Sequence, residues 1–296
     1  VLGYGGWSIT FQRNSDTIQN WGGFAGFDAA IDLANVERSL VLHEIAHAMG
    51  LKHPFEGAKR NRLPASEDSD KFTVMSYDPN PDTGTYGDVL GIYDVLALQR
   101  LWGVASSNPL DTSYTGAQSP IHDTGGVDQI DASSATGSVH IDLRAGRFSS
   151  IESRHDLAIA FGTVIENARG SGFGDVVIGN KRANMIEAGG GGDVVKGRKG
   201  NDYLDGETGA DVLRGGKGRD WIEGSAGDDV LRGGKGRDRL HGGADDDVLI
   251  GGKGADTFVF ETGGGSDRIA DFNRKFDWLV VTGFGDKASL RGVAQK

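Results

Sequence analysis

The stretch that decides the fold runs from residue 215 to residue 240 and reads GGKGRDWIEGSAGDDVLRGGKGRDRL. It repeats a nine-residue unit with aspartate at the sixth position and an aliphatic residue at the eighth. The unit recurs without a gap over residues 170–259, ten times in succession, and only Asn184 replaces the aspartate. The alternative is a disordered glycine-rich linker, but disorder would not preserve a nine-residue period over ten units. The interval is therefore predicted to fold as a repeat.

The pattern predicts a parallel β-roll in which two units form one coil. Each unit supplies a short strand with one inward apolar side chain, and then a turn whose crowded backbone requires glycine. Coils stack at about 4.8 Å, so aspartates two units apart should form two rows. One row would hold Asp175, Asp193, Asp211, Asp229 and Asp247, and the other Asp202, Asp220, Asp238 and Asp256.

These aspartate rows need a cation. Burying one Leu or Val per unit contributes about 1.5 to 3 kcal/mol, whereas ordering nine residues costs on the order of 10 kcal/mol. Calcium takes carboxylate and carbonyl oxygens in flexible numbers, so it can cross-link the coils and couple its binding to folding. The sequence thus predicts several structural Ca²⁺ ions on the nine aspartates. Phe173 and Arg182 replace turn glycines, which weakens the first coil.

A second motif, LVLHEIAHAMGLKHP, occupies residues 40–54. His43 and His47 are four residues apart and so share one helical face, where both imidazoles can reach a single ion. Gly50 can end the helix and let the chain reverse, so that His53 supplies a third nitrogen. Three nitrogens and an open position predict one catalytic Zn²⁺, with Glu44 as the general base for a zinc-activated water.

The pattern H-E-x-x-H-x-x-G-x-x-H is the metzincin signature, which also has a methionine turn, and Met75 in FTVMSYD (72–78) can supply it. With LGIYDVLALQRLWG (90–103), GTVIENARGSG (162–172) and the nonapeptides, these motifs resemble the serralysin-type zinc metalloproteases, whose repeats are called RTX. The resemblance implies that Met75 lies beneath the zinc site. It also implies that Tyr77 is a displaceable zinc ligand that stabilises the tetrahedral intermediate.

The same resemblance implies an α+β zincin (metzincin-like) catalytic domain over residues 1–103, followed by an all-β parallel roll over residues 104–296. Lead-in strands, for example at 138–143 and 157–162, would fill 104–169, the repeats 170–259 and a cap 260–296. Serralysins carry more chain before the zinc helix, so the catalytic domain is expected to be incomplete at its N-terminus. These 296 residues are accordingly expected to bind zinc and calcium but to cleave a generic protein weakly or not at all.

Composition excludes several classes of protein and site. The chain has no cysteine, which rules out disulfides and thiolate zinc ligands. No apolar stretch is long enough for a membrane span. The net charge is −11, and the bases form no evident excess or basic face, so nucleic acid is not an expected partner.

The resulting prediction is a secreted, extracellular, calcium-stabilised zinc metalloendopeptidase with protein or peptide substrates. Export by a type I secretion apparatus follows from the resemblance. The alternative is a non-catalytic RTX calcium-binding module attached to an inactive metal site. Residues 121–131, IHDTGGVDQID, leave two interpretations open: Asp123 and Asp128 could form a further calcium turn, as in the family, or belong to a plain polar loop.

Overall fold

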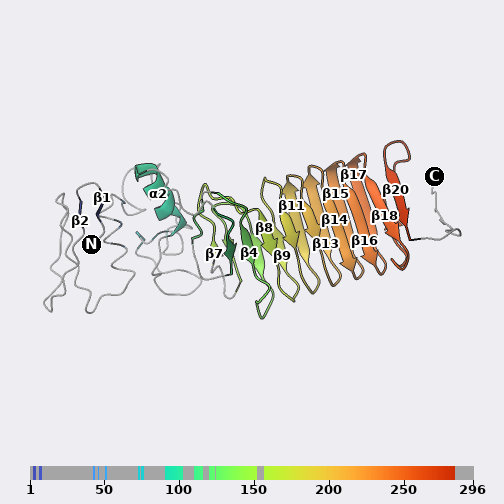
Figure 1. Cartoon of the computed structure of the whole chain (residues 1–296), viewed down its shortest axis with the longest axis horizontal. Coiled ribbons are helices and arrows are strands. Elements are labelled where there is room, and N and C mark those ends of the chain that lie inside the picture. The colour runs from blue at the N-terminus through green and yellow to red at the C-terminus, as the bar shows by residue number, and fades with distance from the viewer. Residues whose placement is uncertain are drawn as a thin grey trace. The chain divides into compact units, whose positions relative to one another are not determined.

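The structure is a computed structural model that describes residues 3–4, 7–8, 43, 46, 51, 73, 75–76, 91–102, 110–115, 120–123, 125–151 and 157–283. The chain divides into two compact units. One comprises residues 1–106 with 119–122, and the other comprises residues 107–118 with 123–296. Figure 1 labels the helix and strands along the chain.

The described part of the first unit contains a strand pair and a helix. β1 (Gly3–Tyr4) pairs antiparallel with β2 (Trp7–Ser8), and α2 spans Ile92–Trp102. Asp94 Oδ2 accepts a hydrogen bond of 2.7 Å from the Gly91 N–H. A first-turn carboxylate that reaches back in this way satisfies a free donor at the helix start. The rest of the predicted zincin domain lies outside the described residues, so that part of the fold class stays a prediction.

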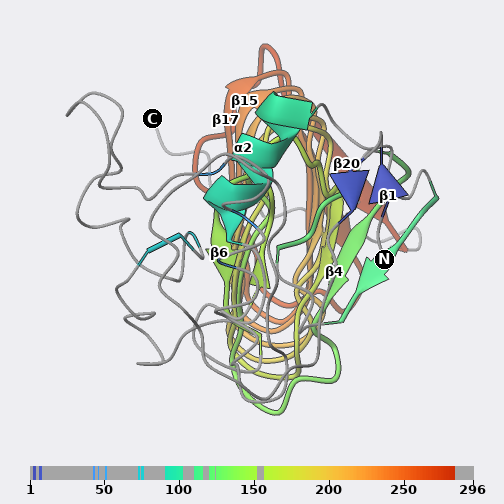
Figure 2. The ribbon, with the colours of Figure 1, turned by 90° about the vertical axis from the view of Figure 1, so that its left-hand side faces the viewer.

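The second unit is the predicted parallel β-roll, built of two sheets (Figures 1 and 2). Seven strands, all parallel, form one sheet in the order β19-β17-β15-β13-β11-β9-β5. Nine strands, also parallel, form the other in the order β20-β18-β16-β14-β12-β10-β8-β4-β3. Successive strands therefore alternate between the sheets through the repeats, as two strands per coil require.

The strands of the seven-stranded sheet are β5 (His140–Asp142), β9 (Val176–Ile178), β11 (Val194–Lys199), β13 (Val212–Lys217), β15 (Val230–Gly236), β17 (Val248–Gly254) and β19 (Arg268–Ile269). Those of the nine-stranded sheet are β3 (Ser113–Tyr114), β4 (Gln129–Asp131), β8 (Asn167–Arg169), β10 (Met185–Glu187), β12 (Tyr203–Asp205), β14 (Trp221–Ala226), β16 (Arg239–Ala244), β18 (Thr257–Glu261) and β20 (Trp278–Thr282). A separate antiparallel pair is formed by β6 (Phe148–Ser149) and β7 (Leu157–Ala158).

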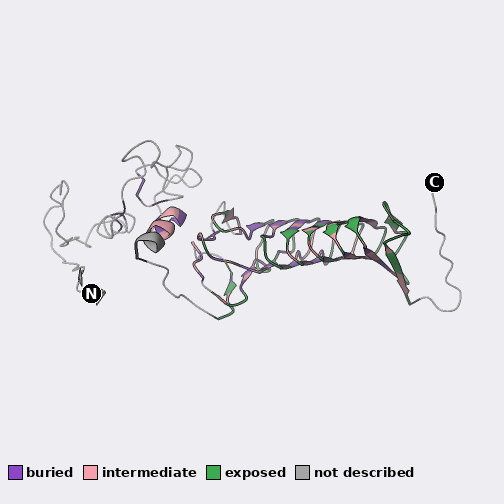
Figure 3. Ribbon diagram, turned by 90° about the horizontal axis from the view of Figure 1, so that it is seen from above, coloured by how far each residue is buried: buried purple, intermediate pink, exposed green. Residues whose placement is uncertain are grey.

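The register confirms the coil of two units. Leu213 lies opposite Val195 on one side and Leu231 on the other, so each coil advances the chain by two nonapeptides. The apolar eighth positions form the core of the roll, and all ten are fully buried. They are Val177, Ile186, Val195, Leu204, Leu213, Ile222, Leu231, Leu240, Leu249 and Phe258. The buried residues follow the coils in Figure 3, and the disordered-linker alternative is wrong.

The lead-in segment extends the same roll. β3, β4 and β8 continue the nine-stranded sheet, and β5 begins the seven-stranded one. The predicted strand at 138–143 contains β5. The one predicted at 157–162 begins with β7, which pairs with β6 outside both large sheets. Beyond the repeats, β19 and β20 add a last coil to the described part of the chain.

Candidate metal centres

The nine predicted aspartates lie where the pattern places them, at the inner side of the turns. Each carboxylate is buried, with 1–2 % of the residue exposed. The two rows follow the two sheets, because each aspartate directly precedes a strand. The first row precedes strands of the seven-stranded sheet, and the second precedes strands of the nine-stranded sheet.

One carboxylate oxygen of each aspartate holds neighbouring coils together. Oδ1 of Asp211 accepts a hydrogen bond of 2.7 Å from the N–H of Asp193, which lies 18 residues earlier. In the second row, Oδ1 of Asp220 accepts one of 3.0 Å from the N–H of Asp202. The same bond recurs through both rows. Stacking of the coils thus uses one of the two oxygen atoms of each carboxylate, Oδ1.

The other oxygen, Oδ2, has no hydrogen-bond partner in seven of the aspartates, although it is buried. These are Asp193, Asp202, Asp211, Asp220, Asp229, Asp238 and Asp247. A buried, charged acceptor without a partner costs several kcal/mol. Asp175, in the degenerate first unit, differs because its Oδ2 accepts a hydrogen bond of 2.6 Å from the Ser171 N–H.

Oxygen atoms converge beside the first glycine of several units. A methyl group built on Gly206 would lie 2.2 Å from Oδ2 of Asp211 and 2.7 Å from the carbonyl oxygen of Gly224. One built on Gly224 would lie 2.2 Å from Oδ2 of Asp229 and 2.5 Å from the Gly242 carbonyl oxygen. Any side chain here would displace an unpaired oxygen. The space favours a small group that accepts oxygen ligands.

Burial raises the pKa of these carboxyl groups because the charged form loses its hydration. The N–H donors of the preceding coil oppose the shift, and for most of the rows neighbouring carboxylates add to it. The pKa rises to about 7 for Asp193, Asp229, Asp238 and Asp247, and to about 6 for Asp202, Asp211 and Asp220. A bound cation would reverse this shift, since it favours the charged carboxylate.

Calcium fits this donor set. Within the described residues, no three His, Asp or Glu side chains converge on one possible metal position. A cation in the rows would therefore take few carboxylates and complete its shell with backbone carbonyls. Calcium accepts such mixed oxygen ligands, whereas zinc prefers nitrogen and sulfur and magnesium demands near-octahedral geometry.

Two acids that the sequence pattern does not predict continue the rows past the last repeat. Oδ1 of Asp267 accepts a hydrogen bond of 3.1 Å from the Asp247 N–H, and Oδ1 of Asp277 accepts one of 3.0 Å from the Asp256 N–H. They follow their partners by 20 and 21 residues. A search at the period of the repeat cannot find them. They could have been found only from their position, because each directly precedes a short strand, as the aspartates of the repeats do.

The predicted turn at residues 121–131 holds two buried acids with protein partners. Asp123 accepts hydrogen bonds from the Tyr114 hydroxyl and, at 3.1 Å, from the Gly125 N–H. Asp128 Oδ1 accepts one of 3.0 Å from the Thr112 N–H, and burial raises the Asp128 pKa to about 6. The neighbouring carboxylates of Asp123, Glu166 and Asp111 add to this rise, and both interpretations of this turn stay open.

Of the predicted zinc-site residues, His43 and Met75 are described. His43 is helical and buried, and Met75 packs in a buried cluster with Ala46 and Leu51. The Leu51 N–H donates to the Ala46 carbonyl at 2.9 Å. A bond spanning five residues in this way closes a helix end and agrees with the end predicted near this point. Glu44, His47, His53 and Tyr77 lie outside the described residues.

Buried hydrogen bonds connect the methionine turn to α2. The Thr73 hydroxyl donates to Asp94 Oδ1 and accepts a bond of 3.1 Å from the Met75 N–H. Asp94 therefore serves both the start of α2 and the turn that carries Met75. Ala97, one turn further along α2, packs against the same cluster.

Comparison with known proteins agrees with the repeats. The profile of the RTX calcium-binding nonapeptide repeat matches residues 169–204, 187–222, 205–240, 223–258 and 233–269. All seven aspartates with an unpaired Oδ2, from Asp193 to Asp247, lie within at least two overlapping copies of this profile. No helix among the described residues has the length and apolar character needed to cross a bilayer.

Curated relatives are proteases by name. The chain is 33 % identical over 186 residues to Serralysin of Proteus mirabilis, covering 52 % of this chain and 38 % of that protein. It is 30 % identical over 233 residues to Serralysin G of Dickeya chrysanthemi, covering 63 % and 49 %. Metallopeptidase AprA of Pseudomonas marginalis is 31 % identical over 190 residues, covering 53 % and 40 %. The chain spans less than half the length of these relatives, and the similarity covers the repeat part.

Proposed function

Because this chain is an RTX-repeat protein related to the serralysins, we propose that it is a calcium-stabilised zinc metalloendopeptidase that acts outside the cell. Its substrates would be proteins or peptides, and export would use a type I secretion apparatus. The roll would be a calcium-dependent scaffold. The chemistry would belong to residues 43–77.

Calcium would occupy the two rows of buried aspartates. The seven unpaired Oδ2 atoms would supply carboxylate ligands, and carbonyls such as those of Gly224 and Gly242 would supply further oxygens. Each ion would neutralise like charges that are otherwise buried side by side and would link one coil to the next. Folding of the roll and calcium binding would then be one process.

Zinc would be held by His43, His47 and His53, with Tyr77 as a displaceable fourth ligand. The observation that carries this proposal is the packing of Met75 against Ala46, three residues after His43 on the same helical segment. The methionine that the motif requires thus contacts the segment that would hold the metal. Thr73 and Asp94 fix the turn through buried hydrogen bonds.

The protein's own groups would perform the proton transfers of peptide hydrolysis. Glu44 would accept a proton from the attacking water and pass it to the leaving amine. The Tyr77 hydroxyl would donate a hydrogen bond to the substrate carbonyl oxygen as negative charge develops there. A zinc ion in this position would supply Lewis-acid assistance to both the water and the carbonyl.

The test compares the chain with its Glu44→Gln variant in calcium. Both proteins should bind about one zinc per chain by elemental analysis, because Glu44 is not a proposed ligand. Cleavage of fluorescent casein, which we expect to be weak for these 296 residues, should fall by a factor of roughly 10² to 10⁴ in the variant, the usual contribution of a general base.

The control is a His47→Ala variant, which lacks a proposed zinc ligand. It should lose both zinc and activity. Absence of zinc from the unmodified chain after zinc loading would contradict the metal site. Zinc binding without any cleavage that depends on Glu44 would favour the alternative, a calcium-binding module with an inactive metal site.

A further inference from the structure

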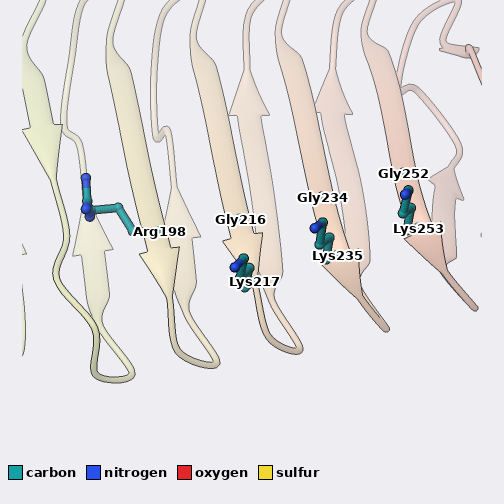
Figure 4. A pocket seen from close by; sticks show the side chains of 7 residues that line it. All are labelled: Arg198, Gly216, Lys217, Gly234, Lys235, Gly252 and Lys253. Atoms are coloured by element: carbon teal, nitrogen blue, oxygen red, sulfur yellow. The ribbon is translucent and has the colours of Figure 1, made fainter.

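Four lysines stack in register along one edge of the roll. Lys199 lies opposite Lys217, Lys217 opposite Lys235, and Lys235 opposite Lys253, on β11, β13, β15 and β17. All four are exposed, and this set is the lysine ladder. Figure 4 shows the side chains of Lys217, Lys235 and Lys253 side by side at the ends of their strands. Neighbouring rungs are about 4.8 Å apart, the spacing of paired strands.

The ladder borders a shallow groove of about 500 Å³, lined by Arg198, Gly216, Lys217, Gly234, Lys235, Gly252 and Lys253. The glycines form a floor without side chains, so a ligand can approach the backbone closely. They cannot be replaced easily, because a methyl group on Gly234 would lie 2.4 Å from the Gly216 carbonyl oxygen. The groove therefore combines a flat backbone floor with a regular series of cations.

This edge corrects an expectation from the sequence. The bases show no basic face when they are counted along the chain, yet the coil register brings four lysines into one row on the roll. The opposite turns carry acids at the corresponding surface, among them Glu207, Asp228 and Asp246. Both series of turns contain buried aspartate rows. The lysines are therefore not needed to form a row of calcium-binding aspartates, because the other series of turns has such a row without them.

The ladder is electrostatically unfavourable without a partner. Like charges directly opposite each other on neighbouring strands destabilise a sheet. Within the described part of the chain, none of the four lysines, nor Arg198, forms an ion pair. Arg198 also has a positive φ of 83°, where the next coils have glycine. A positively charged side chain is thus kept at the end of the groove in a conformation that favours glycine.

We propose that the lysine ladder binds a linear anionic polysaccharide with one carboxylate on each sugar unit. A pyranose unit is about as long as one coil is thick, so the charges along such a chain can stay in step with the rungs of the ladder. The glycine floor allows the sugar rings to lie flat against the backbone. Such binding would hold the protein on an acidic glycan matrix while leaving residues 43–77 unoccupied.

Other polyanions match the groove less well. An extended acidic peptide presents side chains on one face every 6.6 Å or so, out of step with the ladder. Single-stranded nucleic acid is usually held by aromatic stacking, and no aromatic residue lines this groove. Peripheral membrane binding combines cations with inserted apolar side chains, and the lining has none of these either.

The experiment measures binding of hexagalacturonate to the whole chain in excess calcium by isothermal titration calorimetry. Binding should weaken as salt is added, and neutral maltohexaose should not bind. A variant with Lys217, Lys235 and Lys253 each changed to Gln should bind on the order of tenfold more weakly, from the loss of three exposed charge pairs.

The matched control changes Arg268, Arg274 and Lys275 to Gln, which removes the same charge from exposed positions outside the groove. It should bind like the unmodified chain, and circular dichroism should show both variants folded. Equal losses in the two variants, or no binding by the unmodified chain at low salt, would overturn the proposal. Tighter binding of hexathymidylate or of phosphatidylserine vesicles would overturn the choice of a polysaccharide.

Discussion

At the scale of the residue, adjacent aspartates have opposite environments. Asp229 is buried at the sixth position of its unit, and its Oδ2 has no partner, whereas Asp228 at the fifth position is exposed. In both residues Oδ1 accepts a backbone hydrogen bond from a neighbouring coil. The donor to Asp229 is the Asp211 N–H of the preceding coil at 2.7 Å, and the donor to Asp228 is the Asp246 N–H of the following coil at 3.0 Å. The pair isolates the effect of the unpaired buried oxygen.

Asp229→Asn should weaken calcium-dependent folding, while Asp228→Asn should not. Asparagine keeps the Oδ1 acceptor but removes the charged oxygen offered to the cation. Calcium titrations followed by circular dichroism should give a higher midpoint for Asp229→Asn, with a loss of stability of about 1 to 3 kcal/mol. The exposed change should stay within about 0.5 kcal/mol of the unmodified chain. Indistinguishable midpoints for the two variants would contradict a role of Oδ2 in metal binding.

At the scale of the element, each coil combines a stable component with an unstable one. The strands are paired on both sides and bury the eighth-position side chains completely. The turns bury carboxylates whose pKa is raised, because burial disfavours the charge. Without calcium, the free energy gained by pairing and burying the strands must therefore offset the cost of burying the turn carboxylates. Protonation of the carboxylates can take the place of the cation.

Acid should stabilise the metal-free roll. Seven of the row aspartates, from Asp193 to Asp247, have pKa values of about 6 to 7 in the folded chain but near 4 when unfolded, so the folded state binds more protons between these values. Their protonation therefore contributes stability that is complete below about pH 4 and is lost as the pH rises through 6 to 7. Metal-free protein should therefore contain more β-strand at pH 5 than at pH 7.5, measured by far-ultraviolet circular dichroism at one temperature.

With saturating calcium the order should reverse, because protons compete with the metal for the same oxygens. The calcium-loaded protein is thus the control for effects of pH elsewhere in the chain. A metal-free protein that is more stable at pH 7.5 than at pH 5 would show that the buried carboxylates are not the groups that limit its folding.

At the scale of the whole molecule, the two units rely on different sources of order. The roll has one core side chain per nonapeptide and two rows of buried acids. The first unit has a conventional buried cluster around Met75, tied to α2 through Asp94. The roll should therefore respond to calcium far more than the first unit does.

Far-ultraviolet circular dichroism of the chain should change from largely unstructured to rich in β-strand as calcium is added to metal-free protein at neutral pH. The physical reason is that ordering each unit costs on the order of 10 kcal/mol, more than its single apolar side chain contributes. Magnesium at the same concentration is the control and should be much less effective. A spectrum unaffected by calcium and by chelator would contradict the coupling of metal binding to folding.

The sequence by itself determined the roll, its coil of two nonapeptides, its buried apolar positions and its nine aspartates, because each depends on a short period that every unit repeats. It also singled out Met75, which the structure buries against Ala46. Only the tertiary structure decided where the period is broken. Asp267 and Asp277 join the rows after longer intervals, and four of the lead-in strands, β3, β4, β5 and β8, enter the same two sheets. It also decided the lysine ladder, because residues scattered along the chain become neighbours only when parallel strands stack in register.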